Sequence, residues 1–114
     1  MKKHITVEVI AQYAIASKDT STIHLDVNAA RKAGFKRPIA HGMYIMGLAQ
    51  SLYLSEHPTI WITTYKMKFQ KPLFVGTVAI FNFERVKDRV ELAVTTETGE
   101  KIAAGSFLVK ELQR

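Results

Sequence analysis

The chain has 114 residues, of which 47% are hydrophobic and 23% charged, a composition typical of one ordinary globular domain spanning residues 1–114. It contains no cysteine, which excludes disulfides, thiolate nucleophiles and cysteine-ligated zinc. The net charge of +6 favours anionic ligands, but the basic residues are scattered in pairs, a pattern that argues against nucleic acid as the partner.

The start of the chain does not have the pattern of an export signal. Met1 to Lys3 are basic, but the apolar stretch that follows is interrupted by His4, Glu8 and Gln12. No apolar run approaches the roughly 18 residues needed to cross a bilayer. The sequence therefore predicts a cytoplasmic protein that does not span a membrane.

Apolar residues at helical spacing predict a first helix from Val7 to Ser17, with Thr6 capping its first turn. The short polar residues from Asp19 to Thr22 compete for backbone hydrogen bonds and favour a turn. Asp19 and His24 are therefore expected to flank a loop.

Two further helices are predicted. Asp26 can cap a short helix from Val27 to Ala33, which Gly34 ends with a left-handed backbone. A third helix, from about Ala40 to Ser55, is apolar on nearly every face, so we expect it to be largely buried.

The rest of the chain alternates with a period of two. In the first predicted strand, alternate positions share one side of the strand and are mostly apolar: Trp61, Thr63, Tyr65, Met67 and Phe69. Three more strands follow, over 79–84, 90–95 and 102–109, and short connections predict antiparallel pairing. The expected fold class is α+β, with a curved antiparallel sheet wrapped around the central apolar helix.

The stretch from Tyr13 to Leu48 resembles the MaoC-like hydratases, also called (R)-specific or type 2 enoyl-CoA hydratases. The similarity consists of Asp19 five residues before His24, the pair Gly34-Phe35, and the run from Pro38 to Met43 that opens the third helix. The later run from Lys71 to Gly76 is similar to a loop of the same family. The resemblance implies a single hot-dog domain.

The resemblance also implies site roles. Asp19 and His24 would be the catalytic pair that holds a water molecule, takes a proton from it and delivers one to the substrate α carbon. A positioned base is worth roughly 100 to 10,000-fold in rate. The backbone N–H of Gly42 would bind the thioester oxyanion, since unpaired amides at a helix N-terminus favour negative charge.

Three departures from the family pattern concern the loop and the N-terminus. Lys18 replaces a glycine before the aspartate, and Ser21-Thr22 replaces an Asn-Pro pair. Either hydroxyl could take over the hydrogen bonding of the missing Asn, and otherwise the pair would be weakened or its substrate altered. The chain is also expected to lack the N-terminal strand that many relatives carry.

Structural roles are also open to the remaining candidate residues. Met43 could line an acyl pocket, although core packing is the better interpretation, and His41 is expected to make a buried structural hydrogen bond. Gly47 is expected at a close contact between helix and sheet. Phosphate contacts are open to five basic residues, of which Lys66 and Lys68 are the substrate-binding candidates: Lys36, Arg37, Lys66, Lys68 and Lys71.

The predicted function is hydration of a trans-2-enoyl-CoA to an (R)-3-hydroxyacyl-CoA, or the reverse dehydration, by a homodimer or higher homo-oligomer. We expect no metal and no cofactor beyond the coenzyme A of the acyl-CoA substrate. Two alternatives stay open: a thioesterase on the same fold, and a non-catalytic acyl-CoA binding protein. Binding of nucleic acid by the basic surface is the least favoured interpretation.

Overall fold

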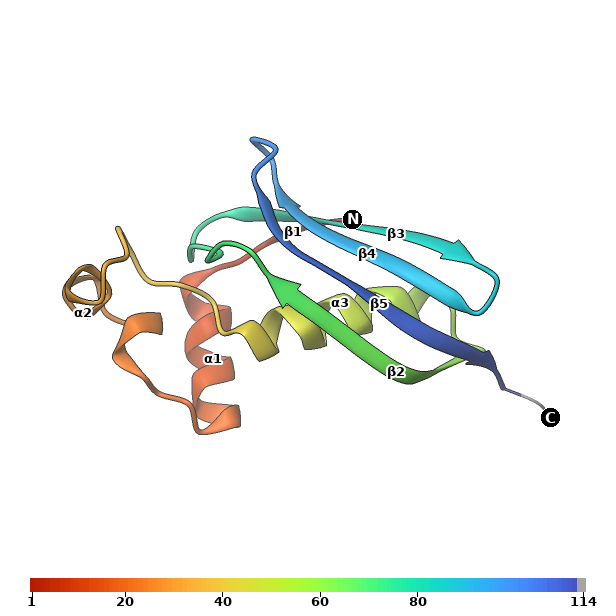
Figure 1. Ribbon diagram of the computed structural model, residues 1–114. Helices are drawn as coiled ribbons and strands as arrows, with labels where there is room; N and C mark the ends of the chain where they lie inside the picture. The colour runs from red at the N-terminus through yellow and green to blue at the C-terminus, as the bar shows by residue number, and fades with distance from the viewer. Residues whose placement is uncertain (113–114) are drawn as a thin grey trace.

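The computed structural model describes residues 1–112, which form three α-helices, one 3-10 helix and one antiparallel sheet of five strands. The elements follow one another as β1 (Lys2–His4), α1 (Val7–Ser17), η1 (Thr22–His24), α2 (Val27–Lys32), α3 (Gly42–Glu56), β2 (Ile60–Phe69), β3 (Val78–Val86), β4 (Arg89–Thr96) and β5 (Lys101–Glu111). In Figure 1 the curved sheet lies along α3, α1 lies beside the N-terminal end of that helix, and α2 lies further out, beyond α1. The α+β prediction is confirmed.

The helix caps are those that the sequence predicts. The hydroxyl of Thr6 accepts a hydrogen bond from the Val9 amide at 3.1 Å, and the Asp26 carboxylate accepts one from the Ala29 amide at 2.8 Å. Gly34 follows α2 with a φ of +96°, a conformation that glycine adopts without strain. The first turns of α1 and α2 are thus each capped by a polar side chain, whereas His41, the N-cap residue of α3, makes no side-chain cap.

The helix α3 is less buried than its apolar composition predicts. Its fully buried residues form one stripe at a spacing of four, Ile45, Ala49 and Tyr53, which packs in the core with inner-face residues of the sheet such as Phe107. Other apolar residues of the helix are only partly covered, and Met43 is 66% exposed. A single chain therefore covers one side of α3, because the sheet contacts only that side.

The sheet has the order β1-β3-β4-β5-β2, so β1 and β2 are its two edges. The expectation that the N-terminal strand is missing was wrong: β1 pairs with β3, with Lys3 opposite Ala79. The strand is three residues long and exposed, so it has no apolar alternation from which it could be predicted.

A second correction concerns the first long strand. The pairing of β2 with β5 shifts between Ile62 and Thr64, which marks a β-bulge. Tyr65 faces α3, where its hydroxyl donates to the Met46 carbonyl at 2.8 Å, but Trp61 lies beyond the bulge and is 60% exposed. The extra residue reverses the parity, so Trp61 does not belong to the inner face as predicted.

Two glycines differ in what surrounds them. A Cβ at Gly105 of β5 would overlap the Lys66 carbonyl oxygen of β2, so these strands approach closely only because this residue is glycine. A Cβ on Gly47 would have nothing within 4 Å. The predicted close contact at Gly47 was therefore wrong, because the glycine lies on the exposed side of α3.

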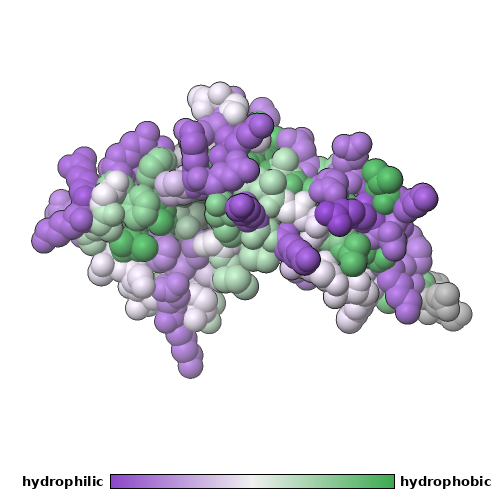
Figure 2. All heavy atoms as spheres, in the orientation of Figure 1, coloured by the Kyte–Doolittle hydropathy of each residue, from purple (hydrophilic) through white to green (hydrophobic). Residues whose placement is uncertain are grey.

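Within residues 1–112, none of the helices is long and apolar enough to span a bilayer. Figure 2 shows a face on which hydrophilic residues dominate and hydrophobic ones remain visible between them. The strongly exposed large apolar residues include Val7, Ile15, Met43, Trp61 and Val86. The single chain thus leaves apolar side chains on its surface as well as in its core.

Candidate active site

Asp19 lies directly after α1, in a loop held by local hydrogen bonds. The helix ends at Ser17, and the φ of +60° at the next residue, Lys18, turns the chain out of the helical path. The Asp19 amide then donates to the Ser17 hydroxyl, and the Asp19 carboxylate accepts from the Ser21 amide, both at 3.3 Å. These contacts explain why a glycine and an Asn-Pro pair can be replaced here: Lys18 takes the left-handed conformation, and Ser21 closes the turn.

His24 is the last residue of η1, and its ring is oriented by the chain that leads into α3. Its Nδ1 donates to the Ile39 carbonyl oxygen at 2.7 Å, because a carbonyl can only accept. In the neutral imidazole, Nε2 therefore carries the lone pair. The side chain is only 10% exposed, so the ring has a fixed position at the edge of the cleft.

The carboxylate of Asp19 and the imidazole of His24 point toward each other. Asp19 Oδ2 lies 3.9 Å from His24 Nε2, which is too long for a direct hydrogen bond. Both atoms are acceptors, and a water molecule between them could donate one hydrogen to each. The predicted pair thus forms a site where one water could be held by two bases.

His41 stabilises this arrangement from behind. Its Nε2 donates to the backbone carbonyl of Asp19 at 2.9 Å, and its ring stacks on that of His24 at 3.7 Å with an interplanar angle of 21°. The residue is 3% exposed, so the prediction of a buried structural hydrogen bond is confirmed. Its Nδ1 is buried with no partner among the described residues.

Gly42 begins α3 next to the same cleft. Within residues 1–112 its amide donates to no acceptor, as expected for the first turn of a helix, and the helix dipole favours negative charge there. A Cβ at this position would lie 3.3 Å from the ring of Phe69. The glycine therefore lets the Phe69 ring of β2 pack closely against the start of α3.

A cleft of about 380 Å³ joins these groups. Seven residues from α1, the loop, η1 and the start of α3 line it: Tyr13, Ser17, Asp19, His24, His41, Gly42 and Met43. Tyr13 and Ser17 were not predicted; Tyr13 meets His41 edge to face at a centroid distance of 4.9 Å. Their signal in the sequence is their position on the last turns of the helix that delivers Asp19.

The predicted lysines lie elsewhere. Lys66 and Lys68 are exposed on β2 and alternate with Tyr65, which faces α3, so they point to the other face of the sheet. Neither lines the cleft around Asp19 and His24. The structure brings together Asp19, His24, Gly42 and Met43 of the predicted site, and it separates the two lysines from them.

Hydrogen bonds from Ser21, through its side chain and its backbone, hold the pKa of the Asp19 carboxyl below its ordinary value of 3.8, and nearby His41 and His24 add to this effect. The side chain is 50% exposed, so solvent screens part of the interaction. Asp19 is a carboxylate at neutral pH and can accept a proton.

One group of side chains has the spacing of metal ligands. Ligand atoms of Asp19, His24 and His41 all lie within 4.8 Å of one another. However, Nε2 of His41 carries the hydrogen that it donates to the Asp19 carbonyl, so this nitrogen has no lone pair for a metal. In this arrangement only Asp19 and His24 of the group have a ligand atom free. Two protein ligands are fewer than metal sites in proteins usually provide.

The chain is similar to known proteins over most of its length. The family model described as MaoC like domain matches residues 1–105. The chain is 30% identical over 69 residues to the mitochondrial 3-hydroxyacyl-[acyl-carrier-protein] dehydratase of Arabidopsis thaliana, a match that covers 60% of this chain and 42% of the plant protein. It is 28% identical over 111 residues to the (R)-specific enoyl-CoA hydratase of Aeromonas caviae, covering 95% and 82%.

The fold is similar to that of a solved hydratase structure. The solved structure described as an (R)-hydratase from A. caviae involved in PHA biosynthesis superimposes with a TM-score of 0.81 at 25% identity, covering 99% of this chain and 92% of that one. The sheet and helix described above are therefore a hot-dog fold. The match to the plant dehydratase spans less than half of that protein.

Proposed function

The chain belongs to the MaoC-like domain family, and from that premise we propose that it adds water to a trans-2-enoyl-CoA to give an (R)-3-hydroxyacyl-CoA, or runs the reverse dehydration. The observation that carries this proposal is the convergence of Asp19 Oδ2 and His24 Nε2, 3.9 Å apart, beside the unpaired amide of Gly42. The A. caviae relative is named for the same reaction class.

In the proposed reaction the enoyl thioester lies with its carbonyl oxygen at the Gly42 amide. A water held between Asp19 and His24 attacks the β carbon as one of these bases takes its proton. Electron density moves to the thioester oxygen, where the amide and the dipole of α3 stabilise it. A proton then returns from the pair to the α carbon, so no net proton is gained or lost and no cofactor is consumed.

The roles of the supporting residues follow from their contacts. His41 would fix the backbone of Asp19 and the plane of His24, and Ile39 would fix the tautomer of His24. Met43, at the mouth of the cleft, would contact the acyl chain. The phosphate contacts predicted for Lys66 and Lys68, the absence of a cofactor, a cytoplasmic location and a homodimer remain predictions from the sequence.

Crotonyl-CoA tests the proposal directly. Loss of the enoyl absorbance with a chiral (R)-3-hydroxy product supports a hydratase, whereas release of free thiol indicates the thioesterase alternative. Binding without turnover of an enoyl-CoA panel supports a non-catalytic binding protein. Asp19→Asn and His24→Ala should each lower kcat by roughly 100 to 10,000-fold.

Two matched variants serve as controls because they lie away from the cleft. Asp88→Asn changes an exposed carboxylate in the β3–β4 turn, and His4→Ala removes an exposed imidazole from β1. Both should keep wild-type activity. Full activity in either Asp19→Asn or His24→Ala would refute the proposed catalytic pair.

A further inference from the structure

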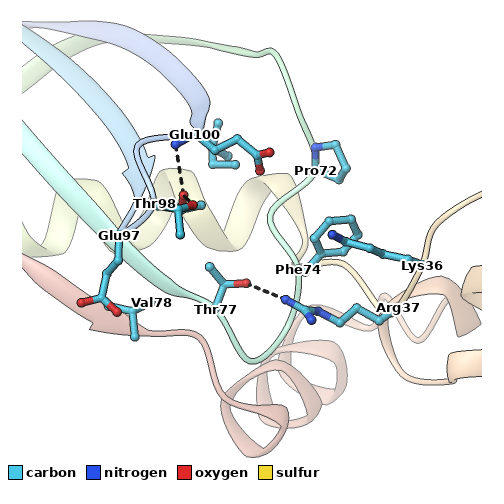
Figure 3. Close-up of a pocket in the computed structure, with 11 residues that line it drawn as sticks. Lys36, Arg37, Pro72, Phe74, Thr77, Val78, Glu97, Thr98 and Glu100 are labelled. Atoms are coloured by element: carbon cyan, nitrogen blue, oxygen red, sulfur yellow. Dashed lines mark hydrogen bonds between the residues drawn. The ribbon is translucent and has the colours of Figure 1, made fainter.

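A second candidate site, which is basic, lies on the other side of the chain segment that leads into α3. We call it the Lys36–Arg37 groove; it has a volume of about 300 Å³ and is lined by those two residues, by Phe74 and Thr77, and by the β4–β5 turn with Thr98. Figure 3 shows Lys36 and Arg37 reaching toward Phe74 from one wall, with Thr98 and Glu100 on the opposite wall. Two chain segments far apart in the sequence thus enclose it.

The two cations of the groove have no acidic partner within residues 1–112. Lys36 Nζ lies 4.9 Å from the centre of the Phe74 ring, and the Arg37 guanidinium carbon lies 5.2 Å from it. Arg37 also donates to the Thr77 hydroxyl at 3.3 Å. The ring and the hydroxyl therefore hold both positive charges in place while leaving them free to bind an anion.

The acidic residues of the same groove are already neutralised by other lysines. Glu97 pairs with Lys2 and Glu100 pairs with Lys71, each at 3.5 Å. The adjoining turn contributes polar atoms, since the Thr96 and Thr98 hydroxyls lie 2.9 Å apart. The net charge available to a ligand is positive, and the hydroxyls and the aromatic ring suit a phosphorylated nucleoside.

An apolar cleft of about 360 Å³ adjoins both this groove and the candidate active site. It shares Gly42 with the Asp19–His24 cleft and Pro72 with the Lys36–Arg37 groove, and its wall includes Phe69. Arg37 and Gly42 are five residues apart, so at most about 18 Å of extended chain separates them. A long, thin arm could run through this cleft from one site to the other.

We propose that the Lys36–Arg37 groove binds the phosphorylated adenosine end of a coenzyme A thioester whose acyl end lies between Asp19 and His24. This inference rests on the proposed function, and it assigns the phosphate contacts to a different face from Lys66 and Lys68. The pantetheine arm occupies the apolar cleft. The nucleotide of coenzyme A fits this groove better than a carrier protein does, because the groove is concave and the β4–β5 turn forms one of its walls.

The test compares crotonyl-CoA with S-crotonyl-pantetheine, which has the same reacting group but lacks the nucleotide. In the double variant Lys36→Gln, Arg37→Gln we expect KM for crotonyl-CoA to rise roughly tenfold or more at nearly unchanged kcat, because binding common to ground and transition states is lost. Activity with S-crotonyl-pantetheine should stay at the wild-type level.

The matched control is the double variant Lys87→Gln, Arg89→Gln, which removes one lysine and one arginine charge at the β3–β4 turn. Its activity with both substrates should equal that of the wild type. Equal loss on both substrates in the Lys36, Arg37 variant, or no loss on either, would overturn the proposal. The proposal would also be overturned if the double variant Lys66→Gln, Lys68→Gln lost activity with crotonyl-CoA alone while the Lys36, Arg37 variant did not. A loss confined to a crotonyl-carrier-protein substrate would instead identify an acidic protein partner and equally overturn it.

A binding measurement separates this inference from the proposed function. Titration calorimetry with adenosine 3′,5′-bisphosphate should show binding to the wild type that weakens roughly tenfold or more in the Lys36, Arg37 variant and not in the control. If the wild type hydrates neither thioester but still binds the bisphosphate through these residues, only the hydratase proposal fails. If it hydrates both thioesters equally and does not bind the bisphosphate, only the groove assignment fails.

Discussion

Hydrogen bonds from Ser21 to the Asp19 carboxyl group lower the pKa of Asp19. Ser21→Ala removes the hydroxyl and keeps the backbone amide, so the pKa of Asp19 should rise toward its ordinary value. The acidic limb of the kcat/KM profile should then move to higher pH, because the carboxylate is lost earlier as pH falls. Thr20→Ala removes a neighbouring exposed hydroxyl and should leave the profile in place; a shift in both variants would contradict the assignment.

The same hydrogen bonds have a consequence for stability. Because the folded-state pKa of Asp19 is lowered, its contribution to folding is fully present above the ordinary value of 3.8 and is lost as pH falls through the lower folded value. In Ser21→Ala the free energy of unfolding should therefore depend less on pH below that ordinary value. Denaturant titrations at several acidic pH values, compared with the wild type, measure this difference.

Lys18 provides a test of the backbone before Asp19. Its φ of +60° is costly for a residue with a Cβ, so Lys18→Gly should raise the free energy of unfolding by about 0.5–1 kcal/mol. The same substitution at Lys32, in the last turn of α2, should lower it by about as much, because glycine weakens a right-handed helix. Denaturant titration of both variants measures the two signs, and a destabilised Lys18→Gly would contradict the structure of this loop.

Helix ends and strand interiors are the parts of this fold that local sequence predicts well. Thr6 and Asp26 cap their helices because a short polar side chain satisfies a free amide within three residues, which needs no tertiary information. The bulge after Ile62 could not be predicted, since an extra residue in one strand is defined by its partner β5. For the same reason Trp61 was placed on the wrong face. The short β1 was missed because its three exposed residues have no apolar alternation.

Some contacts of the candidate site can likewise be predicted from the sequence, and others cannot. The motif around Asp19 and His24 indicates which residues meet, because the family resemblance carries the geometry of the loop. The bond from His41 is different: it was expected in kind, but its acceptor is a backbone oxygen 22 residues earlier, to which side-chain patterns give no clue. Tyr13 lines the cleft because the side of α1 that carries it is turned toward α3.

Close contact between β5 and β2 depends on one residue. Gly105→Ala would place a Cβ on the Lys66 carbonyl, so we expect the free energy of unfolding to fall by about 2–3 kcal/mol, as overpacking of this kind does. Gly47→Ala is the control, because its Cβ meets open space on a helix and should stabilise by about 0.5–1 kcal/mol. Equal stability of Gly105→Ala and the wild type, in denaturant titration, would mean that the strands are further apart.

Assembly of two chains would complete the surfaces that one chain leaves open. The ten-residue strand β2 has an unpaired edge, and on the same molecule Met43 at the cleft is 66% exposed. Pairing β2 with its copy would satisfy the free backbone groups of that edge and bring the exposed side of α3 near the partner. We therefore predict that a homodimer is the active form.

Sedimentation equilibrium should give twice the 12.9 kDa of one chain at the concentrations used for the assay. Because folding is then linked to association, Tm should rise with protein concentration, which a monomer would not show. Dilution below the dissociation constant should lower specific activity together with the dimer fraction. A species of 12.9 kDa with undiminished turnover and a concentration-independent Tm would show instead that one chain builds the whole site.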